Sequence, residues 1–341
     1  MIWFDVTKSG AAGHRSGLNR VSQRLLEGMV GEAKPVRWPE WRGAGVTRDD
    51  WFFTAELFSE DKRPGFSAFL QQRACRTAAV FHDAIPLKHP TITWPQSVAR
   101  HPGYLKLLAR FDRVWAVSAA SRDELLGFWR WQGIASPPSV ELLANGADFD
   151  GQPRVKQAAP PATPPRLLCV GILEPRKNQT FLLEVCAELW DEGLAFELHI
   201  VGRVNPHFGR PVLAQLKRAQ KKYRGLRYHA AASDAAVAKL YATARAGVFP
   251  TIAEGSGLPL VESLWRGVPC VCSDLPVLRE NADGGGCLAA AVNDGAAWKS
   301  ALRSVLTDDG VHARLRSEAT TRALPTWSAA AATVLRGLNG P

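Results

Sequence analysis

The sequence predicts an α/β protein of two domains, each with a parallel sheet covered by helices. Three observations support this prediction. The chain has 341 residues, whereas one domain usually takes about 100–200. Short apolar runs alternate with segments of helical periodicity along most of the chain, which is typical of βαβ units. A proline-rich stretch, GQPRVKQAAPPATPPR over 151–166, divides the chain nearly in half.

Proline removes a backbone donor and fixes φ, so neither a helix nor a central strand is expected within that stretch. It reads as a linker or a long loop between domains. We therefore predict a first domain over 1–150, a linker over 151–165, a second domain over 166–325 and a final helix over 326–341.

In the second half, apolar runs that end at a glycine or a polar residue predict strands, and apolar residues at intervals of three and four predict helices. Strands are expected over Arg166–Val170, Phe196–Val201, Leu226–Tyr228, Ala246–Phe249 and Pro269–Cys272. Helices are expected over Gln179–Trp190, over Pro211–Tyr223 with a strongly basic face, over Ser233–Tyr241 with Ser233 as N-cap, and over Pro259–Arg266.

The first half follows the same alternation less clearly. Its expected strands are Ile2–Val6, Ala78–Phe81, Val114–Val117 and Val140–Leu143, and its expected helices are Gly17–Met29 and Ser121–Trp129, with Ser121 as the cap. An apolar helix over Thr326–Leu338 is expected near the end of the chain.

Composition excludes several classes of protein. Hydrophobic residues make up 46% and charged residues 22%, as in an ordinary globular protein and unlike a disordered chain. No apolar run approaches the roughly 18 residues of a membrane span. The start, Met1–Asp5, lacks the basic and apolar regions of a signal peptide, so a cytosolic protein is expected. The six cysteines lack CxxC spacing and predict structural thiols.

The net charge is +10, and residues 1–165 and 166–341 each carry 21 basic and 16 acidic side chains. This bias suits nucleic acid, an anionic membrane face or phosphorylated small molecules. Trp38, Trp41 and Trp51 lie near arginines, a combination that favours a membrane interface. The alternative is that these tryptophans fill the core.

The most informative segment is EGSGLPLVE over 254–262, which joins a predicted strand to a predicted helix. Gly255 and Gly257 let the backbone approach a ligand closely, and the first turn of the helix offers free N–H groups that suit phosphate. Glu254 and Glu262 can accept hydrogen bonds from hydroxyls. The expected ligand therefore carries both a phosphate and hydroxyl-rich rings, as a nucleotide sugar does. The alternative is a pair of solvated glutamates.

This segment, continued to Asp274, resembles the E-x7-E signature of family 4 of the retaining glycosyltransferases, which have the GT-B fold. The segment VGILEPRKN over 170–178 resembles the loop with which that family binds the donor diphosphate through Arg and Lys. Cations at that place neutralise the leaving group as its charge grows. Ile172 stands where many members have an arginine, and Arg176 or Arg203 is expected to replace it.

Shorter segments of the first half agree. FHDAIP over 81–86 resembles the H-D-x-x-P segment of the mannosyltransferase-like branch, and GAAGHRSG over 10–17 stands where the family has a glycine loop. VSAAS over 117–121 and NGAD over 145–148 resemble its V-S-x-x-S and N-G-V-D segments. DFD over 148–150 has the form of a metal-binding D-x-D motif of another fold, and we interpret it as a coincidence.

The resemblance implies a GT-B fold, with two Rossmann-like domains facing across a cleft and a final helix that crosses back to the first domain. It implies a retaining hexosyltransferase that needs no metal ion or other cofactor. The donor is a nucleoside-diphosphate sugar, with GDP-mannose or a related sugar favoured and a UDP-sugar as the alternative. The acceptor is a glycan or a lipid-linked glycan of bacterial surface polysaccharide or lipopolysaccharide synthesis. We also expect peripheral contact with the anionic inner face of the plasma membrane and no nucleic-acid partner.

The resemblance also assigns the site. The expected catalytic residues are Glu254, His82 and Asp83, and the expected donor-binding residues are Gly13, Arg176, Lys177, Gly255, Ser256, Gly257, Leu258 and Glu262. Glu254 would contact the hydroxyls of the donor sugar, and Glu262 those of the ribose. Arg176 and Lys177 would bind the diphosphate. His82 would bind a sugar hydroxyl or donate toward the leaving group.

Three other functions stay open. A nucleotide-sugar epimerase of the same architecture needs an acid/base pair that no pattern singles out. A non-catalytic glycan- or nucleotide-binding relative would not need both glutamates and the Arg-Lys pair, which are present. A nucleic-acid binder would be driven by the +10 charge, but the sequence contains no recognition module.

Overall fold

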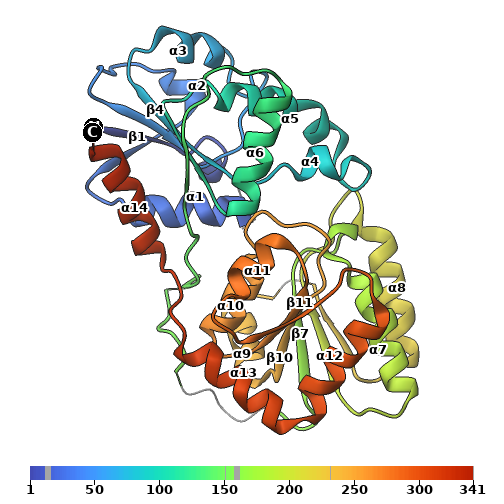
Figure 1. Ribbon diagram of the computed structural model, residues 1–341. Helices are drawn as coiled ribbons and strands as arrows, with labels where there is room; N and C mark the ends of the chain where they lie inside the picture. Colours follow the sequence, from blue (N-terminus) through green and yellow to red (C-terminus); the bar gives the residue numbers. More distant parts are fainter. Residues whose placement is uncertain (12–16, 150, 157–161, 231, 341) are drawn as a thin grey trace. The chain divides into compact units, whose positions relative to one another are not determined.

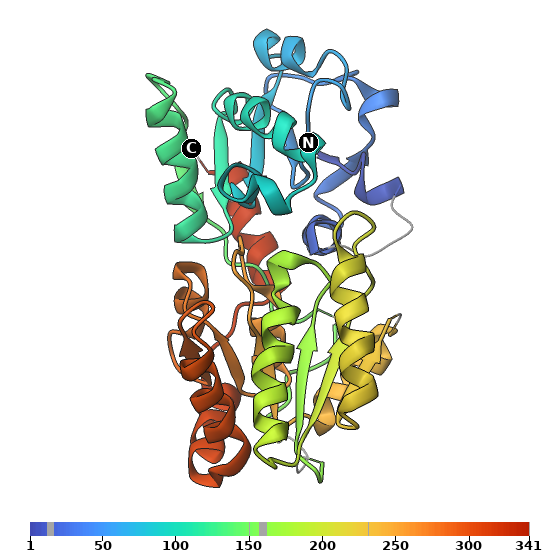
Figure 2. The ribbon, with the colours of Figure 1, turned by 90° about the vertical axis from the view of Figure 1, so that its right-hand side faces the viewer.

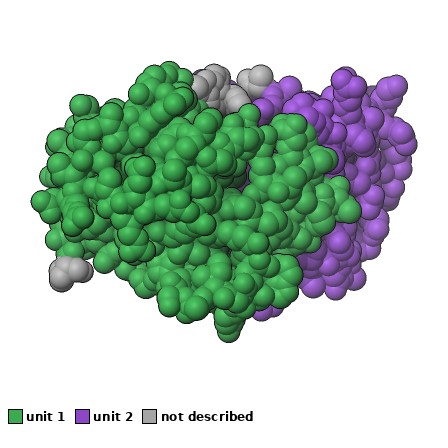
Figure 3. Space-filling view, turned by 90° about the horizontal axis from the view of Figure 1, so that it is seen from above, with its two compact units in different colours: residues 1–146, 325–341 green, residues 147–324 purple. Residues whose placement is uncertain are grey.

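A computed structural model of the protein describes residues 1–11, 17–149, 151–156, 162–230 and 232–340. The chain divides into two compact units, residues 1–146 with 325–341 and residues 147–324, coloured green and purple in Figure 3. Each unit is built around one six-stranded sheet in which all paired strands run parallel. The predicted α/β class with two parallel sheets is confirmed.

The sheet of the first unit has the strand order β2-β1-β3-β4-β5-β6. The order reverses between β1 and β3, which makes this pair the switch point of the sheet. The predicted strands are present, and the structure adds β2 and β3. The six strands are β1 (Ile2–Asp5), β2 (Ala33–Val36), β3 (Trp51–Thr54), β4 (Arg76–Phe81), β5 (Arg113–Ala116) and β6 (Val140–Leu142). Every residue of β3 is buried, so it shows no polar–apolar alternation.

Helices cover both faces of this sheet (Figure 1). One face packs on α3 (Phe66–Gln72), α5 (Pro95–Leu108) and α6 (Ala119–Trp131). The other face carries α1 (Gly17–Glu27) and α14 (Trp327–Asn339), and Trp51 Nε1 on β3 donates to Leu338 O of α14 at 2.7 Å. Short helical segments complete the unit: η1 (Ser9–Ala11), α2 (Trp38–Trp41), α4 (Ile85–Lys88) and η2 (Pro90–Ile92).

The tryptophans near the arginines belong to the core. Trp38 is 2% exposed and Trp51 6%. The Trp38 ring lies 4.9 Å from that of Phe66 and 5.2 Å from that of Phe69, and Trp41 stacks on Phe52 at 5.5 Å. The interpretation of this cluster as a membrane interface is therefore wrong, and the alternative, core packing, is confirmed.

The sheet of the second unit has the order β12-β11-β10-β7-β8-β9, which reverses between β7 and β10. All five predicted strands are present within one or two residues, and β12 is added. The strands are β7 (Arg166–Val170), β8 (Glu197–Val201), β9 (Leu226–His229), β10 (Ala246–Phe249), β11 (Cys270–Ser273) and β12 (Cys287–Ala290).

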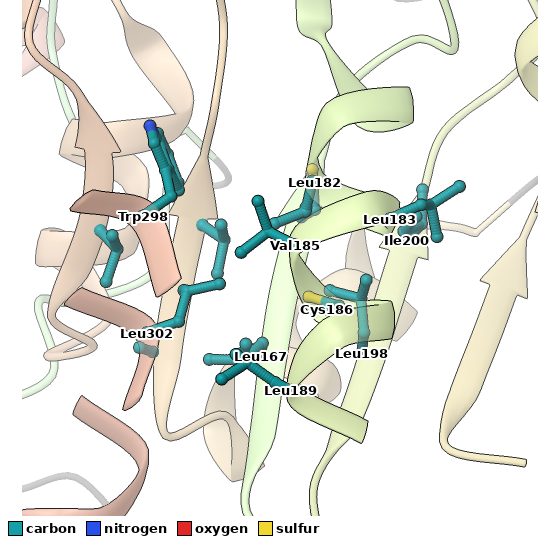
Figure 4. Packing of buried hydrophobic residues seen from close by; sticks show 14 of the residues in the cluster. Leu167, Leu182, Leu183, Val185, Cys186, Leu189, Leu198, Ile200, Trp298 and Leu302 are labelled. Atoms are coloured by element: carbon teal, nitrogen blue, oxygen red, sulfur yellow. The ribbon is translucent and has the colours of Figure 1, made fainter. Parts of the chain in front are cut away.

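Helices also cover both faces of the second sheet. One face carries α7 (Gln179–Asp191), α8 (Gly209–Lys222) and α12 (Gly295–Thr307), and the other carries α9 (Asp234–Thr243), α10 (Leu258–Trp265) and α11 (Pro276–Ala282); α13 (Asp309–Thr321) packs on α12 and α10. Figure 4 shows the core of the first face, where Leu182, Cys186 and Leu189 of α7 and Trp298 and Leu302 of α12 lie over the strands.

The structure confirms one of the two predicted N-cap residues and corrects the other. Ser233 caps α9 as predicted, since its side chain accepts a hydrogen bond from Ala236 N. The cap of α6 is Ser118 and not Ser121: Ser118 Oγ accepts from Ser121 N at 3.0 Å, and Ser121 Oγ donates to His82 O at 2.9 Å. Both serines precede or begin the helix, and only the backbone geometry decides which one caps it.

Two further expectations concern the role of the cysteines and the absence of a membrane-spanning helix. All six cysteines are free thiols; five are buried and Cys287 is half-buried, in line with the structural interpretation. Within the described ranges, no helix has both the length and the apolar character that crossing a bilayer requires.

Candidate functional site

The loops that follow β7 and β10 meet at the carboxyl edge of the second sheet. Ile252 N donates to Arg176 O at 2.9 Å, and Thr251 Oγ1 lies 3.0 Å from the same oxygen. β7 and β10 are neighbours at the reversal of strand order, the place where open parallel sheets bind their ligands. The two motifs that the sequence singled out are thus joined through their backbones.

Glu254 accepts three hydrogen bonds at this junction, all on Oε1. The donors are Arg176 Nη1 at 2.8 Å, Lys177 Nζ at 2.5 Å and Thr251 Oγ1 at 2.8 Å. Burial raises the pKa of the Glu254 carboxyl, but the charges of Arg176 and Lys177 and these hydrogen bonds outweigh burial, so its pKa lies below the ordinary value. The carboxylate is ionised at neutral pH.

Lys177 is the most enclosed cation of the group. It ends the turn η3 (Pro175–Lys177), its side chain is 10% exposed, and its Nζ lies 4.9 Å from the ring centroid of Phe249. Burial lowers the pKa of Lys177, and the neighbouring Arg176 lowers it further, while Glu254 opposes both effects. A carboxylate and an aromatic face together hold this buried ammonium group in place.

Arg176 lies between two glutamates. Its Nε and Nη2 lie 3.0 and 2.8 Å from Glu174 Oε1, and its Nη1 also donates to Ala253 O at 2.9 Å. Glu174 Oε2 accepts from Asn205 Nδ2 at 2.8 Å. Glu174, Arg176, Glu254 and Lys177 therefore form one chain of contacts, and their two negative and two positive charges cancel. Of the two candidate arginines, Arg176 is the one whose side chain contacts Glu254.

The loop after β8 runs beside the loop after β7. Leu173 N donates to Arg203 O at 2.9 Å, and Asn205 N donates to Leu173 O at 3.0 Å. Gly202 has φ +157°, and a Cβ built on it would lie 1.9 Å from Gly171 O, so only glycine fits where the loops cross. The side chain of Arg203, the other candidate arginine, is exposed.

The glycine loop after β10 is fixed by α11. Gly257 has φ +74°, and a Cβ there would lie 2.5 Å from Leu278 Cδ2. Asn281 Nδ2 donates to Ser256 O. Gly255 is buried beside them, and α10 begins directly after the loop, at Leu258. The first-turn N–H groups of α10 therefore start at the predicted donor-binding loop.

Glu262 lies in the second turn of α10 and is half-buried. Burial raises the pKa of Tyr241 on α9 well above its ordinary value, and the nearby charge of Glu262 raises it further. Glu262 is thus close to α9. Gly13, the remaining expected donor-binding residue, lies outside the described residues.

His82 and Asp83 belong to the first unit, directly after β4. His82 is 5% exposed and its Nε2 lies 2.8 Å from Ala55 O, so Nε2 carries the hydrogen. Burial lowers the pKa of His82, which keeps the ring neutral. Asp83 Oδ1 accepts from Ile85 N at 3.0 Å at the start of α4, a structural role that the sequence interpretation did not include.

A second charged cluster lies at the switch point of the first sheet. Arg63 is fully buried, and its Nη2 lies 2.5 Å from Asp5 Oδ2 and 2.8 Å from Glu56 Oε2. Glu56 also accepts from Lys8 N at 2.8 Å and from Ser9 N at 2.7 Å. Asp5 ends β1 and Glu56 follows β3, so this cluster fixes the beginning of the segment after β1.

Sequence reasoning missed several of these residues. Glu174 lies inside the quoted VGILEPRKN segment, and Thr251 is a polar residue two positions after a predicted strand; both signals were available. Asn205 carried no signal, because its partner Glu174 lies 31 residues away. Glu56 follows a strand that was not predicted, and Arg63 reaches Asp5 across 58 residues. Among the described residues, no three His, Cys, Asp or Glu side chains form a group that could hold a metal ion. Asp150 of the D-x-D stretch lies outside them.

Comparison with known proteins identifies relatives of this chain. Residues 164–308 match the family described as glycosyl transferases group 1. The chain is 32% identical over 250 residues to the serotype-specific mannosyltransferase WbdA of Escherichia coli, covering 67% of this chain and 29% of that protein. It is 34% identical over 143 residues to the O-antigen chain mannosyltransferase B of Escherichia coli, covering 42% of this chain and 37% of that protein.

Two solved structures resemble the whole chain. Sucrose-phosphate synthase from Thermosynechococcus elongatus superposes with a TM-score of 0.73 at 16% identity, covering 98% of this chain and 97% of that one. HepE from Anabaena, solved in complex with UDP, gives 0.70 at 14% identity, covering 99% and 98%. At such identities these structures show the fold alone, and that fold is GT-B, as expected.

Proposed function

Residues 164–308 belong to the glycosyl transferases group 1 family, and from this premise we propose that the protein is a retaining mannosyltransferase of bacterial surface polysaccharide synthesis. The names of two relatives, a serotype-specific mannosyltransferase and an O-antigen chain mannosyltransferase, support mannose as the transferred sugar. The acceptor is a glycan or a lipid-linked glycan.

The contacts of Glu254 with Arg176 and Lys177 are the observation that supports this proposal most directly. A donor diphosphate requires cations, and the hydroxyls of its sugar require an acceptor oxygen; the junction of β7 and β10 supplies both within 2.8 Å of one another. Arg176 and Lys177 bind the diphosphate, and Glu254 binds the sugar hydroxyls.

The neighbouring loop completes the donor site in this proposal. The backbone of Gly255, Ser256, Gly257 and Leu258 faces the phosphates with the first turn of α10, and Glu262 accepts hydrogen bonds from the ribose. Arg176, Lys177 and the first-turn N–H groups of α10 replace a divalent metal ion, and no other cofactor takes part. His82 keeps its expected role toward a sugar hydroxyl.

In the reaction, one bond of the anomeric carbon of the donor sugar is replaced by another. The bond from that carbon to the diphosphate oxygen breaks, and a bond to the acceptor oxygen forms on the same face of the sugar. The acceptor proton passes to a phosphate oxygen, so no side-chain base is needed. Arg176 and Lys177 neutralise the charge that grows on the leaving diphosphate, which lowers the barrier.

The test is calorimetric binding of GDP, UDP, dTDP and ADP, without metal and then with magnesium. GDP is expected to bind without metal. Binding of UDP alone would change the donor class but keep the site. Failure of all four nucleotides to bind would remove the basis of the proposal.

We also propose that the protein contacts an anionic membrane face through α8. Residues 203–233 contain no Asp or Glu but eight basic residues, namely Arg203, Arg210, Lys217, Arg218, Lys221, Lys222, Arg224 and Arg227. In Figure 2, α8 is the yellow helix on the side of its unit that faces the viewer. The excess positive charge of the second half is thus concentrated on this part of the unit.

The basic side chains of α8 form a ridge. Arg210, Lys217 and Lys221 are exposed and lie at positions i, i+7 and i+11, on the side of the helix opposite the buried Val212 and Leu216. Such a ridge attracts anionic lipid headgroups without inserting apolar side chains. A lipid-linked acceptor would be presented at that surface.

A further inference from the structure

Glu174 uses both of its carboxylate oxygens. Oε1 lies 3.0 Å from Arg176 Nε and 2.8 Å from Arg176 Nη2, and Oε2 accepts from Asn205 Nδ2 at 2.8 Å. Its side chain is 13% exposed, so these contacts lie out of bulk water. No role was assigned to Glu174 by the sequence.

Asn205 connects this carboxylate to the backbone of the loop after β8. Its Oδ1 accepts from His207 N at 2.9 Å and from Phe208 N at 3.3 Å, just before α8 begins. Its own N–H donates to Leu173 O at 3.0 Å. The Glu174 carboxylate is therefore held by residues of two loops, Arg176 in the loop after β7 and Asn205 in the loop after β8.

A guanidinium group is planar and presents its N–H groups in a rigid fork. Glu174 occupies the edge formed by Nε and Nη2 of Arg176, while Nη1 points to Glu254 Oε1 and Ala253 O. An anion that replaces Glu254 as the partner of Nη1 meets a guanidinium whose plane is already set. A cation oriented in advance loses less conformational freedom on binding and binds more tightly.

We infer that Glu174 is a positioning residue that orients Arg176 toward the donor diphosphate. It acts through Arg176 and does not touch the nucleotide. Its effect falls on the second phosphate, so Glu174 sets how strongly the site prefers a nucleoside diphosphate to the matching monophosphate. This inference rests on the proposed function, because that proposal places the diphosphate at Arg176 and Lys177.

The test compares two dissociation constants in each variant, those of GDP and GMP measured by calorimetry. Their ratio isolates the second phosphate from the base and the ribose. In Glu174→Gln, we expect the preference for GDP over GMP to fall roughly tenfold, the size of one charge-assisted hydrogen bond. Asn205→Ala, which frees the other carboxylate oxygen, should change the ratio in the same direction.

A double-mutant cycle separates positioning from a general structural effect. In an Arg176→Ala background, the guanidinium group that Glu174 orients is absent, so Glu174→Gln should cause no further change in the ratio. The matched control is Glu197→Gln, which breaks an Arg–carboxylate contact of 2.7 Å with Arg166 in the same unit. This control should leave the ratio unchanged.

Three results would overturn the inference: an unchanged ratio in Glu174→Gln, an equal fall in Glu197→Gln, or a stronger preference for GDP in Glu174→Gln. The last would mean that Glu174 only repels the diphosphate. If the wild-type protein binds GDP and Glu174→Gln keeps its ratio, the inference fails and the proposed function stands. If the wild type binds no nucleotide, the proposed function fails, and this inference with it.

Discussion

Lys177 Nζ lies 2.5 Å from Glu254 Oε1, although 77 residues separate the two in the sequence. The contact exists because β7 and β10 are neighbours in the sheet, and each residue lies in the loop that follows its strand. The pair joins the cation that we assign to the diphosphate to the carboxylate that we assign to the sugar. Replacing one partner therefore changes the charge that surrounds the other.

Glu254→Gln should uncouple transfer from nucleotide binding. The amide keeps the shape of the side chain but loses the charge that neutralises Arg176 and Lys177, so both cations stay available to the diphosphate. GDP affinity should not weaken by more than about threefold, while release of GDP from GDP-mannose should slow by roughly 100-fold. Thr251→Val, which removes a neutral donor to the same oxygen, should have a smaller effect. Equal losses of affinity and turnover in Glu254→Gln would contradict these roles.

Glu262→Ala should weaken nucleotide binding itself. Loss of a carboxylate that accepts ribose hydroxyls leaves those hydroxyls without partners, at a cost of about 1–3 kcal/mol. Calorimetry with GDP measures the change. Glu184→Ala removes an exposed glutamate of α7 and serves as the control. Unchanged GDP affinity in Glu262→Ala would place the ribose elsewhere.

Arg63→Met should destabilise the first unit strongly. Asp5 and Glu56 would remain as buried carboxylates without their cation, and breaking such a buried pair costs about 3–5 kcal/mol of unfolding free energy. Urea unfolding followed by tryptophan fluorescence measures the loss. The control is Arg303→Met, since Arg303 pairs with Glu192 at the surface and should contribute no more than about 0.5 kcal/mol. Similar unfolding curves for the two variants would show that the buried cluster adds no stability.

The stability of the protein should decrease as the pH falls below about 6.5. Burial lowers the pKa of His82 in the folded protein below its ordinary value of 6.5, so the unfolded chain binds more protons in that range. The free energy of unfolding then falls with decreasing pH, by at most about 1.4 kcal/mol per pH unit for one histidine. Burial lowers the pKa of His101 and His312 in the same way.

The melting temperature from pH 7.5 to 5.5 measures this dependence. His82→Gln should show a shallower slope, because glutamine does not titrate and its amide nitrogen reaches about as far as the imidazole Nε2 that lies 2.8 Å from Ala55 O. The other histidines leave a residual slope. An identical slope in wild type and variant would mean that His82 is protonated equally in both states.

Reversing the charges of the α8 ridge should abolish binding to anionic vesicles. The variant Arg210→Glu/Lys217→Glu/Lys221→Glu should no longer sediment with phosphatidylglycerol vesicles at low salt, whereas the wild type should. Each basic side chain near such a surface contributes about 1 kcal/mol. The control Lys299→Glu/Arg303→Glu/Arg314→Glu has the same net charge, but the cations it removes are already paired with acids. If both triple variants bind as the wild type does, α8 is not the contact surface; if both lose binding, net charge alone controls it.

The sequence determined the class of fold and most of the second unit. Apolar runs and helical periodicity are local properties, so strands such as Ala246–Phe249 were located to the residue. The β2 strand was missed because Ala33–Val36 contains Lys34 and Pro35 and forms no apolar run, and β3 was missed because all four of its residues are buried and show no polar–apolar alternation. The sequence also singled out Glu254, Arg176 and Lys177 by residue type and by resemblance.

Only the tertiary structure decided which of these residues meet. Strand order depends on packing between segments that lie far apart, and no local pattern records it. The order places β7 beside β10, which brings Lys177 to Glu254, and places β1 beside β3, which brings Asp5 and Glu56 to Arg63. Buried charges require partners of opposite sign, and those partners become visible only once the chain has folded.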